Sequence, residues 1–534
     1  MPQSSGFATQ RLGWRDTVAA FRHPRVITML FLGFSAGLPL LLIFSSLSLW
    51  LREAGVERSV VTLFSWAALG YSFKFVWAPL VDALRLPLLA RLGRRRSWML
   101  LSQSLVIAAI VCIALQDPLG GPRALMYMSA FAVLLGFSAA TQDIVIDAYR
   151  IESAPPRLQA LMSATYIGGY RIGMLVAGAG ALFLASYYGS TLAQYEYTAW
   201  RSTYLWMAAA MAIGVAATLV ISEPARDSKI ETESESKSAP RPIAHDLQLL
   251  RLFALSALAF VLAYALTAGA ADAAKSLLAQ VSGNRALAGL MIEFLRLALA
   301  LGGGALVAVA LIRVGWVDAA VATRSYVQPV QDFFARHGAG VAWLLLGLIA
   351  LYRISDIVLG VIANVFYQDL GFSKVEIATV AKTYGLILSL VGGFLGGALA
   401  LRYGVMRILF VGALLSAATN LLFLALAAAG DHLPMLYLVI SADNLSAGLA
   451  SAAFVAFLSA LTNVRFTAVQ FAIFTSLMTL LPKGLGGYSG AMVDAIGYSH
   501  FFLFTAVLGV PVLALIWLAR RRLSTMRAAM QTEL

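Results

Sequence analysis

Long apolar runs separated by short polar segments dominate the pattern along this chain. A membrane-spanning helix needs about 20 mainly apolar residues. Runs that meet this requirement lie at 26–50, 59–82, 97–116, 124–147, 158–186, 201–222, 248–270, 287–312, 341–365, 375–400, 405–429, 433–461, 466–489 and 500–519. In lipid a helix satisfies every backbone amide within its own segment. The pattern therefore predicts an all-α integral membrane protein with fourteen spans.

The spans fall into groups of six, two and six, and this grouping predicts the domain organisation. Two six-helix bundles are expected at 26–222 and 341–519, with two additional transmembrane helices between them at 248–312. The intervening polar stretches are predicted to be an N-terminal segment 1–25, a linker 223–247, a connector 313–340 and a tail 520–534. The linker holds too few large apolar residues to form a core of its own. Residues 14–21 and 330–334 mix aromatic and charged side chains, which indicates helices on the membrane surface or ordinary connecting helices.

Composition and charge exclude the main soluble classes of protein. Of the 534 residues, 60% are hydrophobic and only 12% are charged, whereas soluble domains average about 25% charged residues. The net charge of +13 lies in short loops and not on one polar face, which excludes a nucleic-acid partner. Of the 39 Lys and Arg residues, 26 lie on the side of the termini and 7 on the opposite side. The positive-inside rule therefore predicts that both termini are cytoplasmic.

An internal repeat indicates two related halves. Residues 51–56 (LREAGV) follow the first span, and residues 367–372 (YQDLGF) follow the ninth. Both read apolar or aromatic, polar, acid, apolar, Gly, apolar. Halves related by an axis along the membrane normal are the plan of major facilitator transporters, which hold substrate between the halves near the midplane. The sequence therefore predicts a major facilitator fold.

Charged residues at the cytoplasmic ends of spans two to four predict a gate. Asp82 ends span two, Arg94 and Arg95 lie in the following loop, and Asp143 and Asp147 lie one helical turn apart at the end of span four. Major facilitator proteins pair a basic loop of this kind with an acid at the inner end of span four, and the ionic cluster holds the cytoplasmic side closed. Orientation of the chain by positive charge would explain the arginines but not the two carboxylates.

Ionisable residues within the spans are candidates for function, because each costs at least about 2.5–3.5 kcal/mol to insert. Glu293 and Arg296 lie three residues apart and can neutralise each other, so a structural role is favoured for this pair. The same spacing in another pair, Arg353 and Asp356, leaves a structural and a functional role equally open. Arg171 has no acid within a turn, and neither does Lys382.

Aromatic residues accompany several of these cations. Cations hold carboxylates or phosphates, and aromatic rings stack on sugar or base faces. The pattern predicts that an anionic, partly ring-shaped substrate is bound by Arg171, Lys382, Lys74, Tyr170, Arg353, Trp77 and Tyr384. For Lys74 the alternative is that its side chain extends to the membrane interface.

Enzymatic and ATP-driven functions are disfavoured. The sequence contains no P-loop, no Ser/His/Asp order of a hydrolase and no metal-ligand cluster, and Cys112 is its single cysteine, so no cofactor is expected. An ion gradient is then the expected driving force. A carboxyl group beside a cation can take up a proton, so Asp356 and Asp443 are the predicted proton-coupling residues.

Motifs in both halves resemble the AmpG muropeptide permeases of Gram-negative bacteria, in the peptide–acetyl-CoA transporter branch of the major facilitators. The resembling stretches are 73–80, 93–96, 141–148, 169–176, 351–353 with Asp356, 382–383 with 385–386, 444–445 leading to 453–456, and 467–472. The resemblance implies proton-driven import of GlcNAc–anhydroMurNAc, with or without a peptide stem, across the inner membrane from periplasm to cytoplasm. Such import serves peptidoglycan recycling and β-lactamase induction.

Two departures from the family pattern accompany the resemblance. The helices at 248–312 are additional to the minimal twelve-span plan, and Asp443 stands where relatives can carry Glu. Two alternatives remain: an acyl-CoA or nucleotide-type anion carrier of the same branch, and a membrane sensor that does not transport. A monomer is expected.

Overall fold

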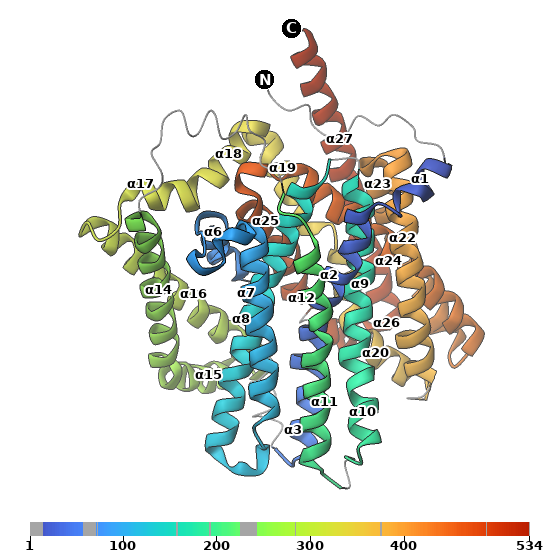
Figure 1. Cartoon of the computed structure of the whole chain (residues 1–534). Coiled ribbons are helices and arrows are strands. Elements are labelled where there is room, and N and C mark those ends of the chain that lie inside the picture. Colours follow the sequence, from blue (N-terminus) through green and yellow to red (C-terminus); the bar gives the residue numbers. More distant parts are fainter. Residues whose placement is uncertain are drawn as a thin grey trace. The chain divides into compact units, whose positions relative to one another are not determined.

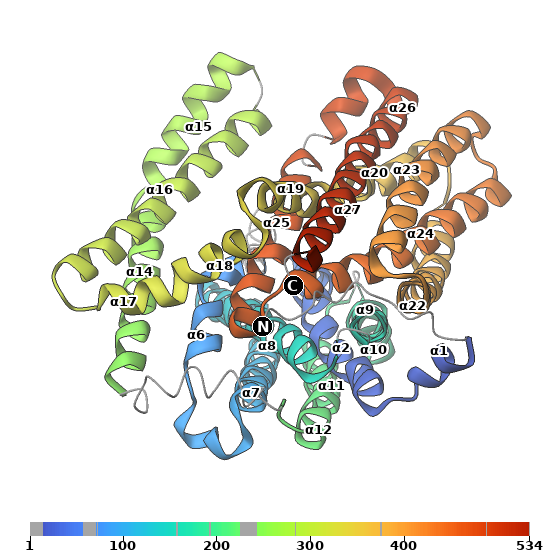
Figure 2. The same cartoon turned by 90° about the horizontal axis from the view of Figure 1, so that it is seen from above.

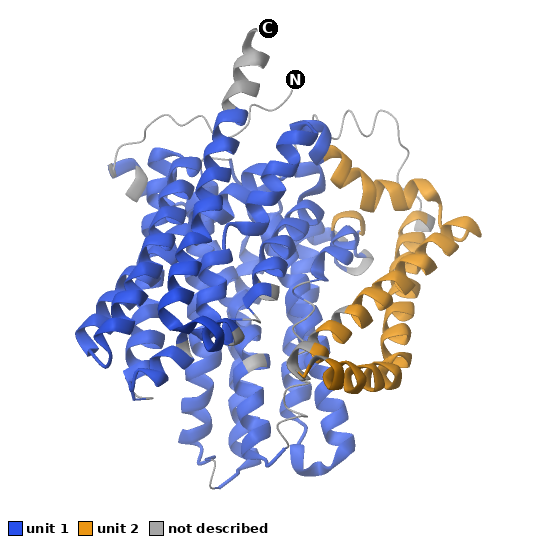
Figure 3. Ribbon diagram, turned by 180° about the vertical axis from the view of Figure 1, so that it is seen from behind, with its two compact units in different colours: residues 1–81, 85–225, 333–534 blue, residues 82–84, 226–332 orange. Residues whose placement is uncertain are grey.

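The computed structural model describes residues 14–56, 71, 73–155, 158–191, 194–224, 243–283, 285–373, 376–486 and 489–532. Thirteen helices in these ranges are long and apolar enough to cross a membrane, which confirms the predicted all-helical membrane fold. Most of the remaining predicted span, 59–82, lies outside the described residues. Contacts divide the chain into two units (Figure 3): unit 1 contains residues 1–81, 85–225 and 333–534, and unit 2 contains residues 82–84 and 226–332.

The long helices of the first half run roughly parallel or antiparallel to one another (Figure 1). The helices of this half are α1 (Trp14–Ala20), α2 (Pro24–Leu41), α3 (Leu47–Glu53), α6 (Ala78–Ala83), α7 (Arg94–Ala114), α8 (Pro122–Ser153), α9 (Gln159–Leu175), α10 (Ala181–Tyr187), α11 (Tyr197–Ala210) and α12 (Ala212–Val220). Wider π-helical turns, η1 (Leu42–Ser46) and η7 (Val176–Gly180), join α2 to α3 and α9 to α10. The first and fifth predicted spans are therefore continuous helices with local distortions.

The second half has a similar series of helices. They are α18 (Gln328–His337), α19 (Ala339–Leu351), α20 (Ile354–Asp369), η9 (Ile377–Tyr384), α22 (Gly385–Tyr403), α23 (Val405–Ala429), α24 (Leu433–Leu461), α25 (Thr467–Gly486), α26 (Ser489–Val507) and α27 (Gly509–Thr532). The predicted single span at 341–365 is broken into α19 and α20. The last helix continues into the predicted tail 520–534. In unit 1, α1 and the end of α27 lie at the same end (Figure 1), which we call the terminal side.

Unit 2 contains the two additional apolar helices, α14 (Ile243–Leu266) and α16 (Arg285–Arg313), together with α15 (Ala268–Ser282) and α17 (Ala319–Ala322). The predicted pairing of Glu293 with Arg296 is present at 3.4 Å. Glu293 also lies 2.5 Å from Lys275 of α15 and accepts a hydrogen bond from the hydroxyl of Tyr264 at 2.8 Å. One carboxylate therefore joins three helices of this unit.

The six-residue repeat has the same structure in both halves. Each helix ends at its acid, and the following Gly55 and Gly371 have φ angles of +78° and +100°, which a residue with a side chain rarely adopts. The amide of Val56 donates to the carbonyl of Leu51 at 2.9 Å, and Phe372 donates to Tyr367 at 3.2 Å. This is the Schellman ending of a helix.

The two acids of the repeat make equivalent contacts with the helix that leads into the sixth predicted span of their own half, α11 in the first half and α26 in the second. Glu53 accepts a hydrogen bond from the indole of Trp200 in α11 at 2.7 Å, and Asp369 accepts one from the hydroxyl of Tyr498 in α26. One turn earlier, Trp50 stacks on Trp200, as Phe366 packs against Tyr498. The repeated signature therefore reflects a duplicated tertiary contact.

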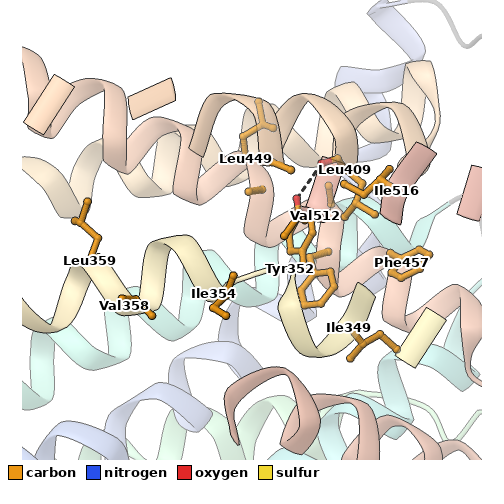
Figure 4. Packing of buried hydrophobic residues seen from close by; sticks show 14 of the residues in the cluster. Ile349, Tyr352, Ile354, Val358, Leu359, Leu409, Leu449, Phe457, Val512 and Ile516 are labelled. Carbon is orange, nitrogen blue, oxygen red and sulfur yellow. Dashed lines mark hydrogen bonds between the residues drawn. The ribbon is translucent and has the colours of Figure 1, made fainter. Parts of the chain in front are cut away.

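Close helix packing forms the core of each half. In the first half, α2 approaches α9 so closely that a Cβ atom on Gly37 would lie 2.0 Å from the carbonyl oxygen of Tyr170. In the second half, Tyr352 packs among Ile349, Val512 and Ile516 and donates a hydrogen bond to the carbonyl of Leu409 at 3.1 Å (Figure 4). Small residues permit such close crossings where lipid supplies no hydrophobic force between helices.

The two halves meet on the terminal side of unit 1. Helix α9 packs against α22 and α24, and α8 packs against α25; the view from above shows α9 beside α22 (Figure 2). A Cβ atom on Gly397 of α22 would lie 2.5 Å from the Cβ atom of Ala164 and 3.0 Å from the carbonyl oxygen of Ala160 in α9. Because α9 begins near Ala160 on the terminal side, the structure is closed there.

Replacing Gly397 with alanine is expected to push the halves apart on the terminal side. Overpacking of this kind typically costs about 1–3 kcal/mol, so we expect a lower midpoint of thermal unfolding in detergent. The matched control is Gly393→Ala, one turn away on α22, where a Cβ atom would meet its nearest neighbour at 3.9 Å. Equal unfolding midpoints for the two variants would contradict the close approach.

Candidate functional site

The basic segment Arg94–Arg96, predicted as part of a loop, forms the first turn of α7, and its arginines pair with one glutamate at the end of α8. The Arg95 side chain is 1% exposed, and its Nε donates to Glu152 at 2.9 Å while a terminal nitrogen binds the other carboxylate oxygen at 2.5 Å. Arg94 lies 3.4 Å from the same carboxylate. The predicted partners of these arginines, Asp143 and Asp147, are therefore wrong. Asp143 and Asp147 lie one to three helical turns before Glu152 on α8, and it is Glu152 that is level with the arginines.

A second glutamate holds the same basic segment at the start of α7. Glu223, which follows α12, accepts hydrogen bonds from the backbone N–H groups of Arg95 at 2.8 Å and Arg96 at 3.0 Å. These groups belong to the first turn of α7, where the helix dipole favours a negative charge. The Arg96 side chain in turn donates to the carbonyl oxygens of Thr218 and Leu219. The basic segment is thus attached to both α8 and the end of α12.

The two aspartates of α8 hold Lys74. The Nζ atom of Lys74 lies 3.3 Å from Asp143 and 3.8 Å from Asp147, and the lysine side chain is 6% exposed. The hydroxyl of Tyr166 donates to the other oxygen of Asp143 at 2.9 Å. The prediction of Lys74 as an unpaired cation, and the alternative that it extends to the membrane interface, are therefore wrong. Its charge is balanced within the first half.

Two aromatic candidates lie beside this ion-pair group. The indole of Trp77 is buried and donates to Thr141 of α8 at 3.1 Å, so it holds the segment after Lys74 against α8. Tyr170 of α9 is half-buried, and the charges of both Asp143 and Arg171 act on it. Tyr170 therefore lies near enough to both Asp143 and Arg171 to feel their charges.

Arg150 connects the two halves. It is completely buried, and it contacts Asp147 at 3.3 Å and the hydroxyl of Ser163 at 2.9 Å in its own half. Across the interface it donates to Ser459 of α24 at 2.7 Å and lies 5.1 Å from the ring centre of Phe471 in α25. One guanidinium therefore links a carboxylate in the first half to two helices of the second half.

The break between α19 and α20 places charged groups within the second half. Arg353 caps the start of α20, donates to Ser451 of α24 at 2.9 Å and lies 3.5 Å from Asp356. Asp356, in the first turn of α20, also accepts a hydrogen bond from Ser416 of α23. The predicted Arg353–Asp356 pair is therefore present. Broken spanning helices that expose a helix N-terminus inside the bundle are a common way to build transporter sites.

Arg171 brings a positive charge from the first half toward this pair. Among the residues that the structure describes, its guanidinium has no hydrogen-bond or ion-pair partner, and the charge of Arg353 acts on it directly. The charges of Asp356 and Arg353 also act on Asp443 of α24. The Arg353–Asp356 pair and the two residues whose charges interact with it, Arg171 and Asp443, are together called the central charge group.

Lys382 and Tyr384 lie on the π-helical segment η9. In the described part of the chain Lys382 has no hydrogen-bond or ion-pair partner, and it is exposed. The hydroxyl of Tyr384 hydrogen-bonds with Ser441 at 2.9 Å, and its ring packs edge-on against Tyr437. The structure records no contact between either residue and the central charge group, so their role in binding stays a prediction.

Other predicted gate residues differ in how well the structure places them. Asp82 is assigned to unit 2 and Arg94 and Arg95 to unit 1, so the part of Asp82 in the gate stays a prediction. The sequence prediction omitted Glu152 and Glu223.

Within the described ranges, no group of three or more His, Cys, Asp or Glu residues could hold a metal ion.

Comparisons with known proteins agree with this architecture. The family model described as Major Facilitator Superfamily matches residues 26–326. The anhydromuropeptide permease of Escherichia coli K12 is 28% identical over 95% of this chain and 82% of its own length. A Rickettsia felis protein that carries the name AmpG 4 is 28% identical over 94% of this chain and 98% of its own length. The proton:xylose symporter XylE, bound to 6-bromo-6-deoxy-D-glucose, shares the fold with a TM-score of 0.54 at 12% identity, over 94% of this chain and 96% of that chain.

Proposed function

The chain belongs to the major facilitator superfamily, and from this premise we propose that it is a proton-coupled importer of anhydromuropeptides. The substrate is GlcNAc–anhydroMurNAc with or without a peptide stem, carried from periplasm to cytoplasm for peptidoglycan recycling and β-lactamase induction. The similarity to AmpG-named proteins, over almost the whole chain, supports this substrate class. We place the protein in the bacterial inner membrane, as a monomer with cytoplasmic termini.

One observation carries the proposal: the charge of Arg353 in the second half acts on Arg171 in the first half, and of these two residues Arg171 has no carboxylate partner in the described part of the chain. Two guanidinium groups in one place repel each other unless an anion lies between them. Guanidinium groups bind carboxylates with two parallel hydrogen bonds. The carboxylates of a peptide stem match this chemistry, and a substrate that bridges the two halves can couple its binding to their movement.

The closed terminal side gives the direction of access. Arg150 and the close approach at Gly397 hold the halves together on the side that we assign to the cytoplasm. The Arg95–Glu152 pair joins α7 to α8 within the first half on the same side. We infer that the substrate reaches the central charge group from the periplasmic side in this state. Opening of the terminal side and closure of the opposite side would then release the substrate into the cytoplasm, as in other transporters built from two halves.

The test is uptake of radiolabelled GlcNAc–anhydroMurNAc-tripeptide by membrane vesicles with an imposed pH gradient. We expect accumulation that depends on the gradient and is competed by unlabelled anhydromuropeptide. Competition by acyl-CoA or nucleotides instead would identify an anion carrier of another specificity. No uptake of any of these compounds would favour a non-transporting sensor, and uptake that ignores the gradient would exclude proton coupling.

A further inference from the structure

Four buried charges connect the membrane interior to the contact between the halves. In order, Asp143, Lys74, Asp147 and Arg150 lie 3.3, 3.8 and 3.3 Å from one to the next. Arg150 then reaches Ser459 of the other half. We propose that the carboxylate pair Asp143–Asp147 binds the driving proton and that Asp147 transmits its charge state to the gate through Arg150. This inference rests on the proposed proton-coupled transport and replaces Asp356 and Asp443 as the coupling site.

The charge balance of these four residues makes their arrangement sensitive to the binding of one proton. Two carboxylates and two cations sum to zero when all four are ionised. A proton on Asp147 leaves one excess positive charge in a region where charges interact strongly because water is largely excluded. Lys74 keeps Asp143 as its partner, whereas Arg150 loses the carboxylate that holds it. Removing one partner of a buried ion pair is strongly unfavourable, so protonation of Asp147 drives Arg150 to leave its buried position.

Leaving that position breaks contacts across the interface. Arg150 donates to Ser459 and stacks over Phe471, and both residues belong to the second half. When Arg150 moves toward water, the first half loses these bonds to α24 and α25. Protonation at Asp147 therefore weakens closure of the terminal side, which is the direction that proton-driven import requires.

The surroundings of the pair favour proton entry at Asp143. The side chain of Asp143 is 13% exposed, against 7% for Asp147 and 6% for Lys74, and it lies one turn farther from the terminal side. Helix α9 presents Tyr166, which donates to Asp143, and Tyr170, on which the charges of both aspartates act. The charge of Asp143 also acts on Tyr71, which precedes the short 3-10 helix η3 (Lys74–Val76), while α25 presents Phe471. A proton arriving from the opposite side thus meets Asp143 first and Asp147 next.

Asp356 lacks this connection to the gate. It pairs with Arg353 and accepts a hydrogen bond from Ser416, and both of these residues lie in the second half. In the described ranges, no printed hydrogen bond or ion pair joins Asp356 to the first half, and Arg171 interacts with its partner Arg353 through charge. A charge change there would alter substrate binding before it altered the contact on the terminal side.

The first test measures the gate without any substrate. Spin labels are attached at cysteines replacing Pro155 and Arg407, which are exposed on the terminal side of opposite halves, in a chain whose Cys112 is replaced with serine. In purified full-length protein we expect the distance between labels to lengthen from neutral to acidic buffer. In Asp147→Asn the distance should be long at both pH values, because asparagine imitates the protonated carboxyl.

Three outcomes decide the inference. Loss of the pH response in Asp147→Asn, with the response kept in Asp494→Asn on the exposed outer part of α26, supports it. A response that persists in Asp147→Asn and disappears in Asp356→Asn overturns it. If Asp147→Asn fails to reach the membrane, Asp147→Asn combined with Arg150→Gln keeps the net charge and is expected to show no pH response; a retained response in this double variant also overturns it.

The second test uses transport itself. Asp147→Asn is expected to accumulate no more substrate with a pH gradient than without one, while exchange of external for internal anhydromuropeptide continues, because exchange requires no net proton movement. Gradient-driven accumulation by this variant would contradict the inference. If the unaltered protein transports no muropeptide, the proposed function fails, and the label distances still decide whether Asp147 controls the gate.

Discussion

Replacing Arg171 with alanine is expected to abolish anhydromuropeptide uptake while leaving insertion into the membrane intact. The guanidinium has no partner among the described residues, so its removal leaves no buried carboxylate unpaired in the protein. The substitution is therefore expected to reduce substrate binding and not protein stability, because the substrate carboxylate loses its bidentate partner. The measurement is initial uptake in vesicles, normalised to the amount of protein in the membrane.

The controls separate charge from geometry. Arg171→Lys keeps the positive charge but not the planar fork of donors, so uptake should fall because binding weakens. Arg123→Ala, at an exposed position in the first turn of α8, should leave uptake unchanged. Lys382→Ala is expected to abolish uptake as well. Normal uptake by either alanine variant would remove that residue from the substrate site.

Replacing Arg95 with alanine is expected to cause the largest loss of stability among the gate variants. The Arg95–Glu152 pair is buried, with side chains 1% and 9% exposed, and removal of one partner of such a pair costs about 3–5 kcal/mol. The matched variant is Arg94→Ala, because Arg94 approaches the same carboxylate at 3.4 Å and is 17% exposed. We expect a clearly smaller loss for this neighbour.

Thermal unfolding in detergent measures both variants side by side, and labels at positions 155 and 407 report the gate. Arg95→Ala should lower the unfolding midpoint and shift the labels toward the open distance. Equal midpoints for the two variants would show that Arg95 is not the main partner of Glu152. A lower midpoint with an unchanged label distance would assign Arg95 a structural role alone.

The limits of sequence reasoning are clearest at the basic segment. The arginines and the acids of α8 were recognised, but Arg94 and Arg95 were paired with Asp143 and Asp147 and not with Glu152. A helix turns every 3.6 residues, so several acids near its end compete for one basic segment. Only the path of the basic segment in three dimensions decides which of these acids lies close enough to its arginines to form an ion pair. Glu223 carries no local signal at all, because it reaches the start of α7 from 127 and 128 residues away in the sequence.

Lys74 shows the same limit within the membrane. Its own helical turn contains no acid, and the partners come from α8, 69 residues later. By contrast, the Arg353–Asp356 and Glu293–Arg296 pairs were predicted correctly, since both partners lie three residues apart on one helix. Partners within a turn are visible in sequence, and partners on another helix are not.

The amino-acid sequence by itself determined the membrane environment, the helical spans, the two-half plan and the repeated turns at Gly55 and Gly371. These features depend on hydrophobicity, helical period and φ angles, which are properties of residues and their near neighbours along the chain. The tertiary structure alone decided which charges are neutralised, where the halves touch and which cations stay without a partner among the described residues. Those outcomes depend on distances between helices that are far apart in sequence, and electrostatic energy depends on distance in space.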